Sequence, residues 1–351
     1  FETNRKLMEE HLRSVDVDQL LYNFRLAAGL DTKGAPPMTG WDAEESKLRG
    51  HTTGHYLSAM VLAYVGTPDE ETREVLGGKV ADLLDGLEEV QTHFSQSGLA
   101  NYGFLSAYSE EQFDLLEEYV TYPNIWAPYY TLHKIVAGLL DAYEYAGSEQ
   151  AMNICRKLMI WQRNRFAKLD NKTLQTMWSM YIAGEYGGMN DVVARFMRLE
   201  QDQSYAEVFK AFDNDKLFYP LTQNIDAISL MHANQHIPQI IGALTYYTAS
   251  GEREYYDIAD NFWQIATRDH IYSIGGIGEG ELFRPTGQIS RYITDKTAEG
   301  CASYNMLKLT RDLYLYEATP DDMDYYERTL FNHIVPSLEP DVPSGGSTYF
   351  M

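Results

Sequence analysis

The chain has 351 residues, and a hydrophobic fraction of 44% is enough apolar material to bury a substantial core. Its formal net charge of −23 argues against nucleic acid or an anionic membrane as a partner, because both require basic surfaces. Two cysteines cannot form a disulfide framework, and no run of about 18 apolar residues could span a membrane. The chain opens on Phe1 without a signal-peptide pattern, so we expect its native N-terminus to be absent and cannot assign a compartment, cytoplasmic or secreted.

Helical periodicity runs through most of the chain. Residues 4–30 carry apolar side chains at helical spacing and end near Gly29. Further helices are expected at 54–66, 73–94, 129–147, 149–169, 172–188, 189–202, 235–251, 253–269, 297–317 and 321–338, many of them ending in glycine. Nearly all-apolar helices alternate with half-polar ones, which predicts an inner ring of helices wrapped by an outer ring. No linker divides the sequence, so we predict one all-α domain over 1–351, with strand-like residues only in the final "SGGSTYFM".

Three long non-helical segments interrupt the helices, at 28–50, 95–128 and 270–300. Long loops in a helical domain are usually functional, and these concentrate Trp, Tyr, Glu and Gly residues. The third segment contains the glycine-rich stretch "GGIGEGELF", which is no phosphate loop because no Lys-Ser/Thr follows it. We expect its glycines to bend the backbone so that Glu279 and Glu281 approach the next helix. The alternative is that both glutamates are ordinary solvated loop residues.

Histidines occur as two pairs spaced i, i+4, which are His51 with His55 and His232 with His236. On a helix each pair would share a face, but neither has the glutamate of the zinc-protease H-E-x-x-H motif. His133 stands alone on an apolar helix, where a hydrogen-bonded core histidine is the simpler interpretation.

The stretch "TAEGCASYNMLKLTRDLYLYE" places Glu299 and Cys301 two residues apart at the start of a helix. The positive end of the helix dipole favours a thiolate there, whereas a neighbouring carboxylate opposes it unless a cation lies between them. Zinc accepts both sulfur and oxygen ligands. Two ligands make half of a zinc site.

Seven motifs in chain order carry a resemblance to a known family: "WDAEESKLRGHTTGHYLSAMVLAY", "WAPYYTLHKIVAGLLDAYEYAG", "EYGGMNDV", "HANQHIPQIIGA", "GGIGEGELF", "EGCASYNMLKLTRDLY" and "DYYERTLFNHI". Together they resemble the β-L-arabinofuranosidases of glycoside hydrolase families 127 and 146, from about residue 15 onward. The resemblance implies an (α/α)6 barrel of the six-hairpin glycosidase type, followed by β-sandwich domains that are absent here. It also implies retaining, exo-acting enzymes that release L-arabinose from L-arabinofuranosides of plant-type glycans.

In that family a zinc-bound cysteine is the nucleophile and a glutamate is the acid/base. The resemblance assigns Glu299 and Cys301 to zinc and Glu281 to the acid/base role, with Glu279 as the alternative. It assigns five residues to the sugar pocket: His51, His133, Glu185, Asn190 and His232. The family's adjacent cysteine pair, which includes the nucleophile, has no counterpart among these 351 residues. We therefore expect the barrel to be incomplete at its C-terminus, the missing part of the same protein to be a required partner, and the isolated chain to be inactive.

Two other functions fit parts of the same sequence. Sugar 2-epimerases also use a helical barrel, with histidines as acid and base, and a non-catalytic module could bind glycans through the aromatic loops. An epimerase would convert its substrate into an isomer without releasing a monosaccharide from a glycoside. The sequence leaves the glycosidic linkage and the parent polymer open.

Overall fold

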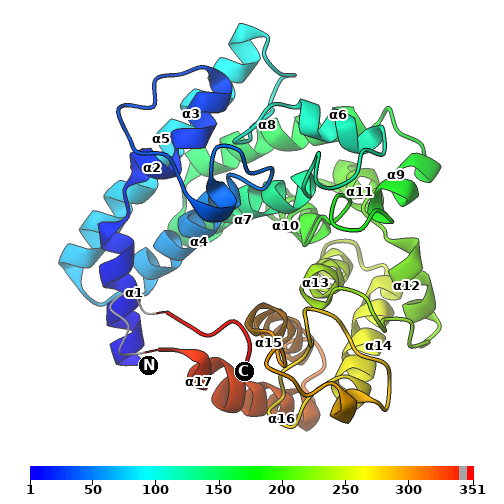
Figure 1. Ribbon diagram of the computed structural model, residues 1–351. Helices are drawn as coiled ribbons and strands as arrows, with labels where there is room; N and C mark the ends of the chain where they lie inside the picture. The colour runs from blue at the N-terminus through cyan, green and yellow to red at the C-terminus, as the bar shows by residue number, and fades with distance from the viewer. Residues whose placement is uncertain (340–345) are drawn as a thin grey trace. The chain divides into compact units, whose positions relative to one another are not determined.

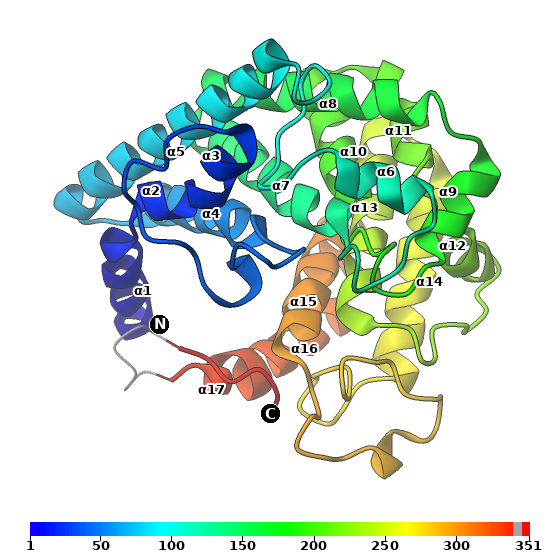
Figure 2. The same ribbon diagram turned by 45° about the horizontal axis from the view of Figure 1, so that its top comes forward.

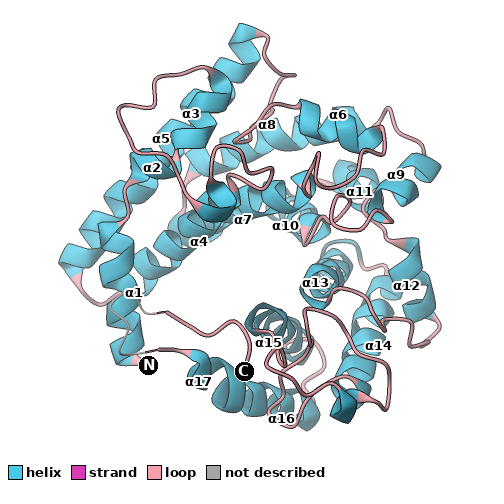
Figure 3. Cartoon of the chain, viewed as in Figure 1, coloured by secondary structure: helices cyan, strands magenta, loops and turns pink. Residues whose placement is uncertain are grey.

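The computed structural model describes residues 1–339 and 346–351. These residues are helices joined by loops, and within them β pairing is limited to isolated bridges (Figure 3). The predicted all-α class is therefore confirmed. No helix among the described residues is long and apolar enough to cross a membrane.

The chain divides into two compact units: an N-terminal unit of Glu9–Phe212, and a C-terminal unit of Asp213–Met351 with Phe1–Met8. The boundary falls within α1 (Glu2–Ser14). The prediction of a single catalytic domain stays a prediction.

The N-terminal unit contains α2 (Val17–Leu20), α3 (Tyr22–Ala28), η1 (Gly40–Asp42), α4 (His51–Gly66), α5 (Glu70–Ser97), α6 (Glu111–Glu117), α7 (Pro128–Ala146), α8 (Glu149–Phe166), α9 (Asn171–Trp178), α10 (Met189–Glu200), η2 (Gln203–Tyr205) and α11 (Ala206–Lys210) (Figure 1). The predicted helix 4–30 is broken into three pieces, because Asp16 accepts the backbone N–H of Asp18 and caps a new helix. The expected end at Gly29 is confirmed, and the residue adopts φ +70°.

Helices α4 and α7 form the close-packed centre of the N-terminal unit. A methyl group on Gly54 would lie 2.2 Å from the Lys134 carbonyl, and one on Gly138 would lie 2.8 Å from the Gly54 carbonyl. Only glycine allows the two backbones to approach this closely. The contact places the first turn of α4, with His51, in register with the α7 turn that carries His133.

The long loop between α5 and α7 is held by buried polar contacts. Glu110 accepts hydrogen bonds from the backbone N–H of Asn101 at 2.8 Å and from the Trp161 indole at 2.8 Å, and Arg165 lies 3.2 Å from the same carboxylate. Burial would raise the pKa of Glu110, but these donors together hold it below its ordinary value. The loop is thereby fixed as it leads into Trp126 and α7.

The C-terminal unit contains α12 (Asp215–Thr222), α13 (Ala233–Ser250), α14 (Arg253–Asp269), η3 (Ile289–Arg291), α15 (Gly300–Tyr314), α16 (Pro320–Thr329), the π-helix η4 (Leu330–Ile334) and α17 (Val335–Ser337) (Figure 2). Helix α13 packs against α14 and α15, and α15 packs against α16. The predicted helix 321–338 thus changes to π geometry at Leu330. The strand-like final residues pair with earlier segments, through antiparallel bridges from Ser347 to Leu338 and from Phe350 to Glu299.

The glycine-rich loop before α15 bends back on itself, as the sequence predicted. Gly278 adopts φ +83°, and its carbonyl accepts the N–H of Ala298 at 2.7 Å. The Ile277 carbonyl accepts the N–H of Glu299 at 2.9 Å. These contacts fold the glutamate-bearing loop against the N-terminus of α15.

Candidate active site

The catalytic candidates of the C-terminal unit gather at the N-terminus of α15. Glu299 is the N-cap residue of that helix, and Cys301 lies exposed in its first turn. The Tyr349 hydroxyl oxygen lies within hydrogen-bond distance of both neighbouring carboxyl groups, at 3.0 Å from Glu281 Oε1 and 3.1 Å from Glu299 Oε1. The predicted pair of metal ligands and the predicted acid/base are therefore brought together around one tyrosine.

Glu299 is fully buried, and its Oε2 atom has no hydrogen-bond partner among the described residues. Burial raises the pKa of this carboxyl group to about 7; the Tyr349 hydrogen bond opposes the shift, and the charge of Glu281 adds to it. A buried oxygen in this state is stabilised by a proton or by a cation.

The start of α15 offers two side chains of the types that zinc binds, a carboxylate and a thiol. Glu299 offers its unpartnered oxygen, and Cys301 offers a sulfur at the positive end of the helix dipole. Among the described residues, however, no group of three His, Cys, Asp or Glu side chains could hold a metal ion. Zinc binding by Glu299 and Cys301 therefore stays a prediction.

Glu281 and Glu279 differ in what surrounds them. The Glu281 side chain is 44% exposed, and its Oε2 faces His232 Nε2 at 3.5 Å. Glu279 is buried, and both of its oxygens are engaged: Arg284 Nε donates to Oε2 at 2.6 Å, and the Thr294 hydroxyl donates to Oε1 at 2.8 Å. Of the two, Glu281 has the exposure that proton exchange with a substrate requires, whereas Glu279 braces the loop.

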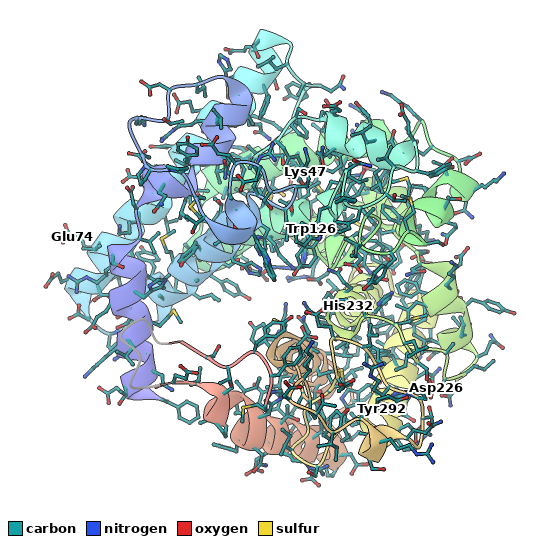
Figure 4. All side chains as sticks on the ribbon, in the orientation of Figure 1. Lys47, Glu74, Trp126, Asp226, His232 and Tyr292 are labelled. Carbon is teal, nitrogen blue, oxygen red and sulfur yellow. The ribbon has the colours of Figure 1, made fainter. Side chains whose placement is uncertain are left out.

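His232 lies directly before α13, where Figure 4 labels it, and its partner of the i, i+4 pair has a different role. Burial lowers the pKa of His232, although the Glu281 charge opposes that shift. His236 Nδ1 donates to the His232 carbonyl at 2.7 Å, and burial lowers the pKa of His236 to about 4. A neutral His236 thus fixes the backbone at the start of α13, and only His232 faces Glu281.

The sugar-pocket candidates of the N-terminal unit gather around Tyr130. The His51 ring stacks on Tyr130 at a centroid distance of 6.2 Å, and Lys134 Nζ lies 4.1 Å above the same ring. His133 Nδ1 accepts hydrogen bonds from Lys134 Nζ at 3.0 Å and from the Gly188 N–H at 3.2 Å. Because Nδ1 is an acceptor, the neutral His133 ring carries its proton on Nε2.

The turn before α10 connects the remaining two candidates to this cluster. A methyl group on Gly187 would lie 3.0 Å from the Tyr130 ring and 3.2 Å from His133 Nδ1, so the turn packs directly on both. Glu185 precedes this turn and is half-buried, whereas Asn190 is fully buried in the first turn of α10. Of these two candidates, only Glu185 is therefore partly accessible to solvent.

The Asp42 carboxylate lies beside Nδ1 of His51 and orients that ring. It is buried, accepts the Gly50 N–H at 2.6 Å and the Thr52 hydroxyl, and lies 3.4 Å from His51 Nδ1. Burial alone would raise the pKa of Asp42, but the hydrogen bonds from His51, Thr52 and Gly50 hold it below its ordinary value. The ionised Asp42 thereby holds Gly50, the N-cap residue of α4, and faces Nδ1 of His51.

Exposed aromatic rings border the same cluster. Trp41 is 57% exposed, with its ring centroid 5.7 Å from His51 and 6.4 Å from Trp126, which Figure 4 labels. Tyr122 packs edge-on against Trp126 at 5.5 Å. Indole faces of this kind suit the C–H faces of sugar rings. The sequence had indicated aromatic enrichment of these loops, but it did not single out Trp41, Trp126, Tyr130 or Tyr349.

Comparisons with known proteins bear on the family and the fold of the chain. The family model described as the β-L-arabinofuranosidase GH127 catalytic domain matches residues 1–351. A solved GH127 β-L-arabinofuranosidase from Geobacillus stearothermophilus T6 is similar in fold, with a TM-score of 0.67 and 14% identity over 99% of this chain and 57% of that one. A second solved GH127 β-arabinofuranosidase has a TM-score of 0.67 and 16% identity over 99% of this chain and 54% of that one. A further solved glycoside hydrolase has a TM-score of 0.59 and 11% identity over 94% of this chain and 51% of that one. No curated protein matches the chain by sequence.

The chain spans little more than half the length of these solved proteins. At such low identity the likeness shows the fold alone, which is that of the α/α-barrel enzymes expected from the sequence.

Proposed function

Because the chain belongs to the GH127 β-L-arabinofuranosidase catalytic-domain family, we propose that it provides the acid/base and half of the metal site of a retaining, exo-acting β-L-arabinofuranosidase. The substrates would be L-arabinofuranosides of plant-type glycans, and the product L-arabinose. The observation that carries the proposal is the half-exposed Glu281 carboxyl group, linked through one tyrosine to the buried Glu299 beside Cys301.

Glu281 acts first as the general acid. It donates its proton to the glycosidic oxygen while the bond from that oxygen to the anomeric carbon breaks and a thiolate forms the new bond to that carbon. In the second step Glu281 accepts a proton from water, whose oxygen replaces the sulfur at the anomeric carbon. Two displacements at one carbon retain its configuration.

The attacking thiolate would belong to the family's adjacent cysteine pair, for which these 351 residues have no counterpart. Cys155 cannot serve, because it is buried within α8 and burial raises its pKa to about 12. Glu299 and Cys301 would hold zinc, which when bound lowers the pKa of a coordinated thiol. Within the N-terminal unit, the residues around Tyr130 would bind a sugar ring, with His133 donating from Nε2 and Trp41 offering an apolar face.

The test uses the full-length, zinc-loaded protein and 4-nitrophenyl and methyl β-L-arabinofuranosides. We expect free L-arabinose, with the β anomer formed first, and a loss of about 10²- to 10⁴-fold in kcat/KM on the methyl glycoside for Glu281→Gln. Glu279→Gln is the matched control, because it removes a carboxylate two residues away that is engaged by Arg284.

Three outcomes would contradict the proposal. Turnover of Glu281→Gln within a few-fold of the parent would remove Glu281 from the mechanism. A large loss confined to Glu279→Gln would assign the acid/base role to that residue. An isomerised sugar without hydrolysis of a glycoside would favour an epimerase.

A further inference from the structure

The Tyr349 side chain contacts both the proposed acid/base, Glu281, and a proposed metal ligand, Glu299. We propose that Tyr349 is a positioning residue for catalysis, whose hydroxyl group orients the carboxyl groups of Glu281 and Glu299 together. The inference rests on the proposed function, because it assumes that Glu281 transfers the proton.

The backbone fixes the place of Tyr349 independently of its side chain. The Tyr349 carbonyl accepts the N–H of Gly300 at 2.9 Å, and the N–H of Met351 donates to the Thr297 carbonyl at 3.0 Å. Phe350 forms a bridge with Glu299. The segment is therefore tied, at Tyr349 and the two residues after it, to residues 297–300 where α15 begins, so the phenol ring starts from a fixed point beside Glu299.

The hydroxyl group contacts the same kind of atom on each side. It contacts Oε1 of Glu281 at 3.0 Å and Oε1 of Glu299 at 3.1 Å, so these two oxygens lie no more than about 6 Å apart. In each carboxyl group Oε1 faces the Tyr349 hydroxyl group, and Oε2 points away from it. Oε2 of Glu281 faces His232 at 3.5 Å, which is too long for a strong hydrogen bond, and Oε2 of Glu299 is buried without a partner among the described residues.

The contact with Tyr349 is the main restraint on the Glu281 side chain. The Glu281 side chain is 44% exposed and has several rotatable bonds, and the backbone of this residue adopts φ +68°, an uncommon conformation outside glycine. Among the described residues, Tyr349 provides the only hydrogen bond to the Glu281 side chain within 3.2 Å. Without the hydroxyl group, the carboxyl group would sample several rotamers, and the fraction that points Oε2 at the glycosidic oxygen would fall.

A role of Tyr349 in packing alone can be distinguished from a role of its hydroxyl group. Tyr349 is 41% exposed, and its ring packs edge-on against Phe350 at 4.6 Å, a contact that phenylalanine would preserve. Replacement of the hydroxyl group alone therefore separates orientation of the carboxyl groups from packing of the ring.

The test is Tyr349→Phe in the full-length, zinc-saturated enzyme, with the methyl and the 4-nitrophenyl β-L-arabinofuranosides as paired substrates. Methoxide needs a proton to leave, whereas 4-nitrophenolate does not, so loss of oriented acid affects the first substrate more. We expect kcat/KM to fall about 10- to 100-fold on the methyl glycoside and less than about threefold on the 4-nitrophenyl glycoside. The zinc dissociation constant should rise about 10- to 100-fold, as for other residues that orient a metal ligand.

Tyr304→Phe is the matched control, because this tyrosine of α15 is 56% exposed and has no contact with either glutamate in the structure. It should leave both substrates and zinc binding unchanged. An unchanged kcat/KM for Tyr349→Phe on the methyl glycoside, an equal loss on both substrates, or an unchanged zinc affinity would each overturn the inference.

The same experiment separates failure of the inference from failure of the proposed function. If Glu281→Gln shows the leaving-group dependence and Tyr349→Phe does not, only the role of Tyr349 is wrong. If Glu281→Gln also leaves hydrolysis of the methyl glycoside intact, the acid/base assignment is wrong, and the role of Tyr349 is overturned with it.

Discussion

The contact between α4 and α7 gives the most direct test of how the N-terminal unit holds its sugar-binding candidates. Gly54→Ala would place a methyl group 2.2 Å from the Lys134 carbonyl and 2.5 Å from the Ile135 nitrogen, whereas ordinary contacts lie at 3.4–4 Å. Because the opposing atoms belong to a helix backbone, no side-chain rotation relieves the overlap. The two helices must separate by about 1 Å along their contact, a backbone shift of the kind that overpacking forces.

The expected magnitude follows from two opposing contributions. Overpacking typically costs about 1–3 kcal/mol, and a backbone-to-backbone contact belongs at the upper end of that range. Replacement of glycine by alanine inside a helix stabilises the helix by about 1 kcal/mol. We therefore expect Gly54→Ala to lower the free energy of unfolding by about 2 kcal/mol.

Gly78→Ala is the matched control, because Gly78 lies in α5 and a methyl group there would meet nothing within 4 Å. It should raise stability by about 0.5–1 kcal/mol through helix propensity alone. Urea unfolding followed by circular dichroism would measure the stability of both variants. Gly54→Ala should also raise KM for 4-nitrophenyl β-L-arabinofuranoside in the full-length protein, because His133 moves with α7. If Gly54→Ala is as stable as Gly78→Ala, the close approach of the two helices is refuted.

Three further predictions concern the site residues. Trp41→Ala should raise KM for aryl arabinofuranosides about 3- to 10-fold with a smaller change in kcat, because it removes an exposed indole face; an unchanged KM would exclude sugar stacking there. Asp42→Asn should cost about 1–3 kcal/mol at neutral pH. Since the folded-state pKa of Asp42 is lowered, its ionised form stabilises the fold above about pH 4, and the parent's advantage over Asp42→Asn should shrink as the pH falls through the folded pKa; a constant difference would contradict this. Elemental mass spectrometry should find zinc lost from Glu299→Gln and retained in Cys155→Ser, and equal zinc in both would remove Glu299 from the metal site.

Some features were predictable because they depend on neighbours along the chain. The helix ends at Gly29 and Gly147 follow from the left-handed conformation that glycine adopts at low cost, and both residues have φ near +70°. The bend that carries Glu281 back to α15 follows from closely spaced glycines in a segment without helical periodicity. The Glu-x-Cys pair at a helix start is likewise local, since capping and the helix dipole act over a single turn.

Some predicted helix ends were wrong, because the same apolar side chains can be buried by a helix or by a turn. The periodic pattern of 172–188 predicted one long helix, but α9 ends at Trp178, whose indole donates to the Ala211 carbonyl at 2.8 Å. The residues that follow form the turn that packs on Tyr130 and His133. An apolar pattern cannot distinguish a helix that continues from a chain that turns to bury the same side chains elsewhere.

The sequence by itself determined the helical class, the helix start that carries Glu299 and Cys301, and, through its ordered motifs, the family. Only the tertiary structure decided which of two nearby glutamates reaches solvent, because Arg284 and Thr294 engage Glu279 and leave Glu281 to Tyr349. Tyr349 lies 68 residues after Glu281 and 50 after Glu299. No local propensity links residues so far apart, and it is backbone pairing of the final segment with the start of α15 that brings the hydroxyl group to both carboxyl groups.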